Sequence, residues 1–223
     1  MPRNNNPVEG SGSDVTLGAT DGSSTSIPTP RPGTGARQEA KAERRSGLLK
    51  AAARIMAERG FHATRLDDIG SAVGISGPAL YRHFSSKHDL LTAVLVDVSE
   101  RLQAGGEKVL DAAPDPESAL DSLIAFHVHF AFTETELIGV QDRELLNLEP
   151  TAREKVATLQ RTYLQLWYET LSKLKPELDD DAVKARCRAA VGMINASRHV
   201  VGRRLEDPTR AALPGMCRTA LTS

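Results

Sequence analysis

The feature that most constrains the fold is a repeated pattern of helix starts and stops along an amphipathic chain. From about Gln38 onward, apolar residues recur at the three- and four-residue spacing of α-helices, and no stretch alternates with the period of a half-buried strand. Capping residues such as Ser76, Ser86 and Asp115 stand where these periodic segments begin. The sequence therefore predicts an all-α protein of about nine helices.

The expected helices are separated by glycine, proline and capping residues. Gly60 should end the first long helix, and Gly74 the short second one. Thr64 and Asp67 have the spacing of a capping box, in which a carboxylate follows the cap hydroxyl by three residues. The predicted helices cover about residues 38–59, 66–73, 77–84, 86–110, 115–133, 136–148, 151–174, 181–205 and 207–221.

The first 37 residues differ in composition from the rest. Glycine, serine, proline and threonine make up 21 of these 37 residues, and large apolar side chains are scarce. Because such a segment cannot bury enough apolar surface to offset its ordering entropy, residues 1–37 are predicted to be a disordered tail. The remaining chain is predicted to form two domains, residues 38–92 and residues 93–223.

The net charge of −1 conceals an uneven distribution. Residues 1–37 carry three positive and three negative side chains, residues 38–90 carry nine Lys or Arg against six Asp or Glu, and residues 91–223 carry sixteen against twenty. The three segments therefore have charges of 0, +3 and −4. A basic module attached to an acidic body indicates that one end of the molecule faces phosphate.

Composition also excludes several classes of protein. No run of about 18 uncharged apolar residues occurs, so no membrane span is expected. The N-terminus lacks the basic and apolar regions of a secretory signal. Cys187 and Cys217 are too few for a disulfide framework and fit a reducing cytosol. These features predict a cytoplasmic protein.

Residues 66–84 have the arrangement of a helix-turn-helix, whose second helix enters the DNA major groove. Gly77, Pro78 and Ala79 lack bulk and would let the backbone of this helix approach the bases closely. Hydrogen-bonding groups at its edges come from Ser76, Tyr81, Arg82 and His83.

Phosphate contacts are expected from residues that flank the motif. Lys87 begins the following helix, and Thr64 lies at a helix terminus whose backbone N–H groups can bind an anion. Cations that either contact DNA or stay solvated are Arg44 and Arg45 of the first helix and Arg31 and Arg37 of the tail. Tyr81 and His83 have the alternative of ordinary packing, and Arg82 can read a guanine edge or bind phosphate.

The segment from Phe61 to Leu91 resembles the DNA-binding signature of TetR-family transcriptional regulators. The pieces T-x-x-x-x-I, V-G-I-S, L-Y-R-H-F and K-x-x-L-L match at the family's spacing, after a first helix that reads A-A-x-x-I-M-A-E-R-G. The resemblance covers about residues 44–92. Gly70, where the family usually has alanine, is expected to loosen the second helix, and Gly77 replaces a base-reading polar residue. Direct readout is then expected from Tyr81, Arg82 and His83, or from Arg65.

What the resemblance implies for residues 93–223 is a domain that binds a small-molecule effector and forms a homodimer through its last two long helices. Such a dimer presents two recognition helices to a pseudo-palindromic double-stranded DNA operator. Small and apolar residues that suit this contact are Ala182, Ala185, Ala189, Ala190, Gly192, Ala196, Leu213, Met216, Ala220 and Leu221. The implied function is a repressor that the effector releases from its operator. An activator, or a regulator without an effector, is the alternative.

The aromatic residues of the C-terminal body gather in two places and are candidates for the walls of an effector cavity. The candidate lining residues are Phe126, Phe130, Tyr163, Trp167 and Met193, and the candidate polar contacts are Arg143, Asn195 and His199. Each apolar residue has the alternative role of core packing. Relatives of this type suggest a lipid intermediate or an acyl-CoA as the effector.

Metal and enzyme sites are not indicated. His127 and His129 are two residues apart, so their side chains on a helix point about 200° apart and cannot share a metal ion. Neither CxxC nor HExxH occurs, and the chain has no phosphate-binding loop, GxSxG motif or paired ExxH motif. No metal, cofactor or catalytic residue is therefore predicted. The large acidic body also argues against a purely architectural DNA-binding protein.

Overall fold

The computed structural model describes residues 34–200 and 206–223 of the 223-residue chain. Within these ranges every regular element is a helix, which confirms the predicted all-α class. The elements are α1 (Thr34–Arg59), α2 (Leu66–Ala72), α3 (Gly77–Tyr81), α4 (Lys87–Asp111), α5 (Pro116–Thr133), α6 (Thr135–Glu144), the 3₁₀ helix η1 (Leu145–Asn147), α7 (Pro150–Leu174), α8 (Asp180–Val200) and α9 (Glu206–Thr222). Most of the predicted tail, and the predicted helix end at Leu205, lie outside the described residues.

Local capping and glycine geometry explain several of the helix boundaries. The Ser86 hydroxyl accepts a hydrogen bond from the backbone N–H three residues later, at 3.1 Å, and begins α4. The Asp115 carboxylate accepts a similar bond at 2.8 Å and begins α5. Gly60 and Gly74 follow α1 and α2 with φ of 80° and 69°, a left-handed conformation that favours glycine. These boundaries were predicted correctly because each depends on neighbouring residues.

Several boundary predictions differ from the structure. The helix predicted over residues 136–148 is divided into α6, which ends at Glu144, and η1. α1 begins at Thr34, four residues before its predicted start, and α3 ends at Tyr81 instead of about residue 84. The capping box is wrong, because α2 follows Arg65, which makes no side-chain cap bond. Thr64 is only 1% exposed, and its hydroxyl donates to the carbonyl of Gly60 at 2.8 Å. The buried threonine therefore stabilises the turn after α1 and does not cap α2.

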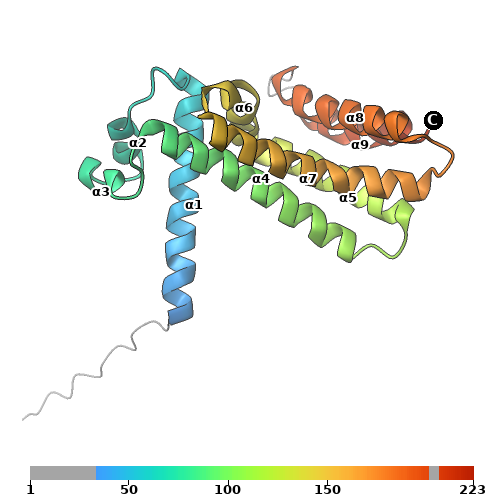
Figure 1. Cartoon of the computed structure of the whole chain (residues 1–223), viewed down its shortest axis with the longest axis horizontal. Coiled ribbons are helices and arrows are strands. Elements are labelled where there is room, and N and C mark those ends of the chain that lie inside the picture. The colour runs from blue at the N-terminus through green and yellow to red at the C-terminus, as the bar shows by residue number, and fades with distance from the viewer. Residues whose placement is uncertain (1–33, 201–205) are drawn as a thin grey trace, which may run out of the picture.

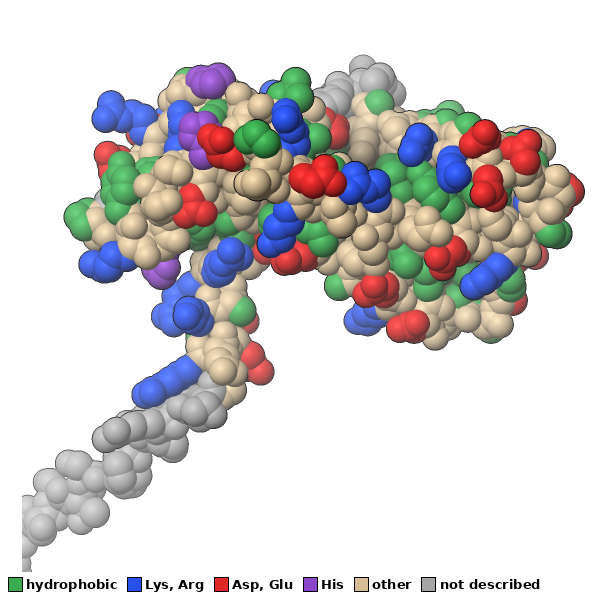
Figure 2. Space-filling view, in the orientation of Figure 1, with side chains coloured by type: hydrophobic (Ala, Val, Ile, Leu, Met, Phe, Trp, Pro, Cys, Tyr) green, Lys and Arg blue, Asp and Glu red, His purple; other side chains and the backbone are tan. Residues whose placement is uncertain are grey.

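The helices form a small unit at one end and a longer bundle beside it (Figure 1). α1 crosses the bundle near one end, and α2 and α3 pack together beside it. α4 runs from this end along the body in contact with α5 and α7, while α8 and α9 pair with each other and cover α5. On the face seen in Figure 2, acidic and basic side chains are mixed over the bundle. α4 also crosses the predicted domain boundary at residue 92 without a break.

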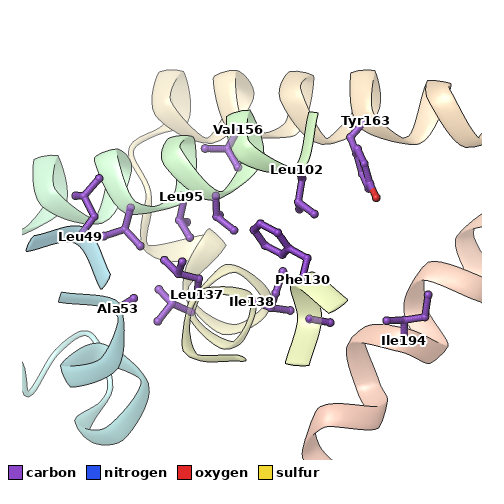
Figure 3. Packing of buried hydrophobic residues seen from close by; sticks show 14 of the residues in the cluster. Leu49, Ala53, Leu95, Leu102, Phe130, Leu137, Ile138, Val156, Tyr163 and Ile194 are labelled. Atoms are coloured by element: carbon purple, nitrogen blue, oxygen red, sulfur yellow. The ribbon is translucent and has the colours of Figure 1, made fainter. Parts of the chain in front are cut away.

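One continuous apolar core extends from α1 to α9. Figure 3 shows the part of it between Leu49 and Ile194. Two adjacent glycines let α4 pack closely against its neighbours. A Cβ at Gly105 would lie 2.2 Å from the ring of Phe126, and a Cβ at Gly106 would lie 2.9 Å from Tyr163. Larger residues at these two positions would push α4 away from α5 and α7.

The length and polarity of the helices do not match those of a membrane span. Within the described ranges, no single helix is long and apolar enough to cross a bilayer. Among the helix pairs of these ranges, Pro116–Thr133 and Thr135–Asn147 together reach that length and composition, but the pair is bent by 88°.

Candidate nucleic-acid interface and internal cavity

The short helix α3 presents a polar edge to solvent. Tyr81 is 54% exposed, and Arg82 and His83 are exposed in the turn that follows. On the other side of this segment, Leu80 and Phe84 are buried in the core. At the start of α3, Ser76 and Pro78 are exposed, Ala79 is half-buried, and Gly77 occupies the first helical position. The Ser76 hydroxyl makes no cap bond, so it can bind a partner.

A groove of about 280 Å³ lies beside Tyr81 and brings four of the predicted DNA-binding residues together. It is lined by Thr64, Arg65, Leu66, Asp67, Tyr81, Ser86 and Lys87. The Lys87 ammonium donates to the backbone carbonyls of Phe61 and His62, at 2.8 and 2.9 Å, and lies 4.5 Å from the centre of the Phe61 ring. Lys87 therefore holds the turn between α1 and α2 in place, a structural role that the sequence did not suggest.

A second groove, of about 370 Å³, lies between α1 and the end of the α3 segment. Its lining residues are Lys41, Arg44, Arg45, Leu48, Ile75, His83 and Phe84. The structure thus brings the predicted residues Arg44, Arg45 and His83 to one place. Lys41 was not singled out from the sequence, although it precedes Arg44 by three residues and so lies on the same helix face.

The turn between α2 and α3 is tighter than the sequence suggested. The Ile75 N–H donates to the Gly70 carbonyl at 2.9 Å, and a Cβ at residue 70 would lie 2.8 Å from the Ile75 carbonyl oxygen. Alanine at this position would force the backbone to shift. Gly70 therefore permits a close approach of α2 to the turn before α3, while its expected loosening of the second helix stays a prediction.

A partly open cavity of about 200 Å³ lies in the bundle, between the long helices α4 and α7 and the shorter α5, α6 and α8. Its lining residues are Ser99, Leu102, His127, Ile138, Gln141, Asp142, Gln160, Tyr163, Leu164, Val191 and Asn195. Two of the predicted effector contacts, Tyr163 and Asn195, are among them. Trp167 is fully buried behind the cavity, with its ring centre 5.9 Å from that of His127.

The other predicted effector residues lie elsewhere. Phe126 packs on Gly105, and the guanidinium of Arg101 lies 5.2 Å from the centre of the Phe130 ring. Arg143 donates to the backbone carbonyl of Ala57 at 3.0 Å, at the contact between α6 and α1. Met193 is half-buried at the margin of the core. His199 falls in the last turn of α8, outside the described side chains.

A buried polar network forms one wall of the cavity. The Nδ1 atom of His127 lies 2.8 Å from the Tyr163 hydroxyl, and its Nε2 atom lies 3.1 Å from Asn195 Oδ1. Burial lowers the pKa of His127 to about 4, so the ring is neutral at pH 7 and carries one N–H. Because Asn195 Oδ1 only accepts, Nε2 donates to it and Nδ1 accepts from Tyr163.

The cavity wall contains further polar groups that can bind an effector. The side-chain oxygen of Gln141 is buried and accepts no hydrogen bond from the residues that the structure describes. Burial also raises the pKa of Tyr163, which keeps its hydroxyl protonated. Sequence reasoning considered His127 only as a metal ligand and did not consider Gln141, because their positions in the bundle depend on the fold.

Helix α6 joins this cavity to α1. The Glu144 carboxylate accepts a bond from the Phe61 N–H at 3.3 Å, one residue along the chain from the Arg143 contact with α1. Nearby, Glu134 accepts bonds from Lys50 of α1, at 2.8 Å, and from Arg101 of α4. Burial alone would raise the pKa of Glu134, but these two bonds outweigh it and hold the pKa below its ordinary value.

Metal ligands do not cluster in the described part of the chain. No group of three His, Cys, Asp or Glu side chains gathers there to hold a metal ion. Cys187 and Cys217 are free and buried, and burial raises their thiol pKa values to about 12 and about 11.

The N-terminal and C-terminal parts of the chain each match a known family model. Residues 48–94 match the family model for bacterial regulatory proteins of the tetR family, and residues 113–199 match the tetracyclin repressor-like C-terminal domain. The transcriptional activator FasR of Mycolicibacterium smegmatis is 35% identical over 120 residues, which cover 52% of this chain and 54% of FasR. The transcriptional repressor KstR2 of the same organism is 30% identical over 151 residues, which cover 64% of this chain and 73% of KstR2.

A solved structure gives the same result for the fold. The TetR-family regulator PfmR from Thermus thermophilus superposes with a TM-score of 0.65 at 26% identity, covering 77% of this chain and 97% of PfmR. The chain spans only about half the length of FasR but nearly three quarters of KstR2. The chain therefore belongs to the TetR family of bacterial regulatory proteins, which bind operator DNA as dimers, regulate transcription and respond to small-molecule effectors.

Proposed function

We propose that this chain is a homodimeric transcriptional repressor that reads its operator with α3 and is released by an effector. The observation that carries the proposal is the course of α4. Its start, at Ser86 and Lys87, borders the groove beside Tyr81, whereas Ser99 and Leu102 of the same helix line the cavity. Ser99 follows Lys87 by twelve residues, which corresponds to about 18 Å of helix. One continuous helix therefore joins the operator-reading surface to the effector site.

The operator contacts are assigned to the exposed edge of α3 and to the two grooves beside it. Base contacts are assigned to Tyr81, Arg82 and His83, with Ser76, Gly77, Pro78 and Ala79 close to the bases. Phosphate contacts are assigned to Arg44, Arg45 and Arg65 and to the backbone N–H groups at the start of α4. Thr64 and Lys87 support the groove from within, through their bonds to backbone carbonyls.

The dimer contact is assigned to the outer faces of α8 and α9. Ala185, Ala189, Gly192 and Ala196 are exposed at helical spacing and form a stripe where a second helix can approach closely. Met216 of α9 is 54% exposed and offers an apolar anchor beside this stripe. Burial of this face between two subunits would place two copies of α3 on one operator.

Repression is favoured over activation by the extent of the similarity. The match to the repressor KstR2 covers 64% of this chain, whereas the match to the activator FasR covers 52%. The protein is proposed to act by binding, without catalysis. Because operator DNA lies in the bacterial cytoplasm, the proposed location is the cytoplasm.

The cavity favours an effector whose buried part is uncharged. Its lining includes neither lysine nor arginine, its one carboxylate belongs to Asp142, and His127 is neutral. Among the described residues that line the cavity, an anionic head group would therefore meet no lysine or arginine. The buried oxygen of Gln141 instead suits a hydroxyl or other donor on the effector. Among the lipids and acyl-CoA molecules expected as effectors, the cavity therefore favours those that insert a neutral segment into it.

Selection of bound sequences from a random DNA pool tests the DNA-binding half of this proposal. A pseudo-palindromic site should be enriched, and Tyr81→Ala should abolish that enrichment while the dimer and its helicity remain. Neutral lipid-like compounds titrated into the operator complex test the other half. Because coupling is reciprocal, an effector must bind the free protein more tightly than the DNA complex by the factor by which it weakens operator binding. Equal effector affinity for both forms would contradict release.

A further inference from the structure

The N-terminal half of α1, residues 34–47, projects from the rest of the molecule (Figure 1). Every described side chain between Gly35 and Gly47 is exposed or half-buried, and the first buried residue of α1 is Leu48. A helix of this length is only marginally stable without packing. A partner that covers this segment would stabilise it.

Opposite charges are separated around this projecting helix. At 100° per residue, Arg37, Lys41, Arg44 and Arg45 fall within an arc of about 100°. Glu39 and Glu43 lie on the opposite side of the helix. Figure 2 shows the same separation, with basic side chains along one side of the projecting helix and acidic ones along the other. A partner on the basic side would therefore be anionic.

The basic side of the helix faces in the same direction as α3. Lys41, Arg44 and Arg45 line the same groove as His83, which lies just after α3. In Figures 1 and 2 the basic side chains of the projecting helix lie toward α2 and α3. The basic face is therefore continuous with the surface assigned to operator reading.

We propose that the basic face of residues 34–47 lies along the phosphate backbone of the duplex that flanks each operator half-site. This inference rests on the proposed function, because it requires α3 to contact DNA. Fourteen helical residues span about 21 Å, which corresponds to about six base pairs at 3.4 Å per base pair. The contact is made by cations on phosphates, so it adds affinity without reading sequence.

Two double variants with matched charge changes test the proposal on the full chain. Arg37→Gln with Lys41→Gln removes two cations far from the folded body, and Glu39→Gln with Glu43→Gln removes two carboxylates from the opposite face of the same segment. Glutamine is a good helix former, so both variants should keep the helix. Operator affinity would be measured at several salt concentrations, on duplexes whose flanks beyond the selected site range from about two to about ten base pairs, which brackets the expected contact length.

The cation variant should bind the long-flank operator on the order of tenfold more weakly at low salt. Each lost phosphate contact lowers the slope of log affinity against log salt by about 0.9, so four contacts per dimer lower it by about 3.6. The carboxylate variant should keep the wild-type slope. Wild-type affinity should also fall once the flanks are shorter than about six base pairs, while the affinity of the cation variant should depend less on flank length because only Arg44 and Arg45 remain on the basic face.

The outcomes separate this inference from the proposed function. If both double variants and the wild type share one salt slope on a specifically bound operator, the basic face is only solvated and the inference is wrong. If wild-type affinity does not depend on flank length, the inference is also wrong. If no sequence is enriched, or Tyr81→Ala binds normally, the proposed function fails and the inference fails with it.

Discussion

Lowering the pH from 7 to 4 should reduce the free energy of unfolding by about 3 kcal/mol through a single side chain, His127. Burial holds the pKa of His127 at about 4 in the folded chain, whereas an unfolded histidine has a pKa of 6.5. Between these two values the unfolded chain takes up a proton that the folded chain does not. Stability is therefore complete above pH 6.5 and falls as the pH falls toward 4. Each pH unit in this interval is worth about 1.4 kcal/mol.

Carboxylates contribute mainly at lower pH, so the effect of His127 can be separated from theirs. Hydrogen bonds from the backbone N–H and hydroxyl of Ser118 lower the pKa of Asp115, whose ordinary value is 3.8. The pKa of Glu134, ordinarily 4.5, is lowered as well. Groups with lowered carboxyl pKa values stabilise the fold above their ordinary pKa, and this contribution is lost as the pH falls below it. Most of that loss begins where the loss from His127 is nearly complete.

The assay is urea unfolding of the wild type and of His127→Gln at several pH values between about 7 and about 4.5, at one protein concentration because dimer dissociation is coupled to unfolding. At pH 7 the variant should be less stable, because it loses the bond between the imidazole and Tyr163. As the pH falls from 6.5, the difference in free energy of unfolding between the wild type and His127→Gln should shrink by about 1.4 kcal/mol per pH unit. If the two proteins keep a constant difference across this range, His127 is not a buried neutral group and the account of the cavity wall is wrong.

Further predictions concern the DNA-binding unit, the dimer and the thiols. Lys87→Ala should lower stability by about 1–3 kcal/mol in thermal melts, because two backbone carbonyls lose their donor, whereas Arg65→Ala should weaken operator binding at unchanged stability. A stable Lys87→Ala with impaired DNA binding would reverse these two roles. Met216→Lys should shift the chain from dimer to monomer in analytical ultracentrifugation, and an unchanged dimer would exclude this part of α9 from the contact. Cys187 and Cys217 should react with a thiol reagent only after denaturation, because they are buried and their pKa values are raised; rapid labelling of the native protein would show that α8 and α9 open.

The helical framework could be predicted because its signals are local. Ser86 and Asp115 cap helices through backbone groups three residues away, and Gly60 and Gly74 adopt the left-handed conformation just past a helix end. Thr64 has a similar local signal, because Asp67 follows it at capping-box spacing, but its side chain does not cap α2. Its side chain is buried and its hydroxyl donates to the carbonyl of Gly60, and this burial depends on the tertiary structure.

The cavity proposed for the effector was predicted only in part because its walls come from several helices. The sequence correctly predicts Tyr163 and Asn195 as lining residues of the cavity, and the side chains of both contact the imidazole of His127. Arg143 was expected in the cavity but instead contacts the carbonyl of Ala57, near the end of α1. A free guanidinium and a free helix-end carbonyl satisfy each other wherever the fold brings them together, so only the tertiary structure decides this role.

Helix α1 is held at its C-terminal end, near the cavity, whereas its basic N-terminal half projects from the molecule. The C-terminal end of α1 is held by Arg143 and by the bond of Glu144 to the Phe61 N–H, both from the helix whose Gln141 and Asp142 line the cavity. The whole helix of 26 residues is about 39 Å long, so a turn of about 5° at the anchored end moves the N-terminal end by about 3 Å. Such a shift is comparable to the length of an ion-pair contact. A small rearrangement of α6 would therefore displace α1 most where α1 carries its exposed cations, so we expect the proposed flanking phosphate contacts to be the part of the complex most sensitive to the proposed effector.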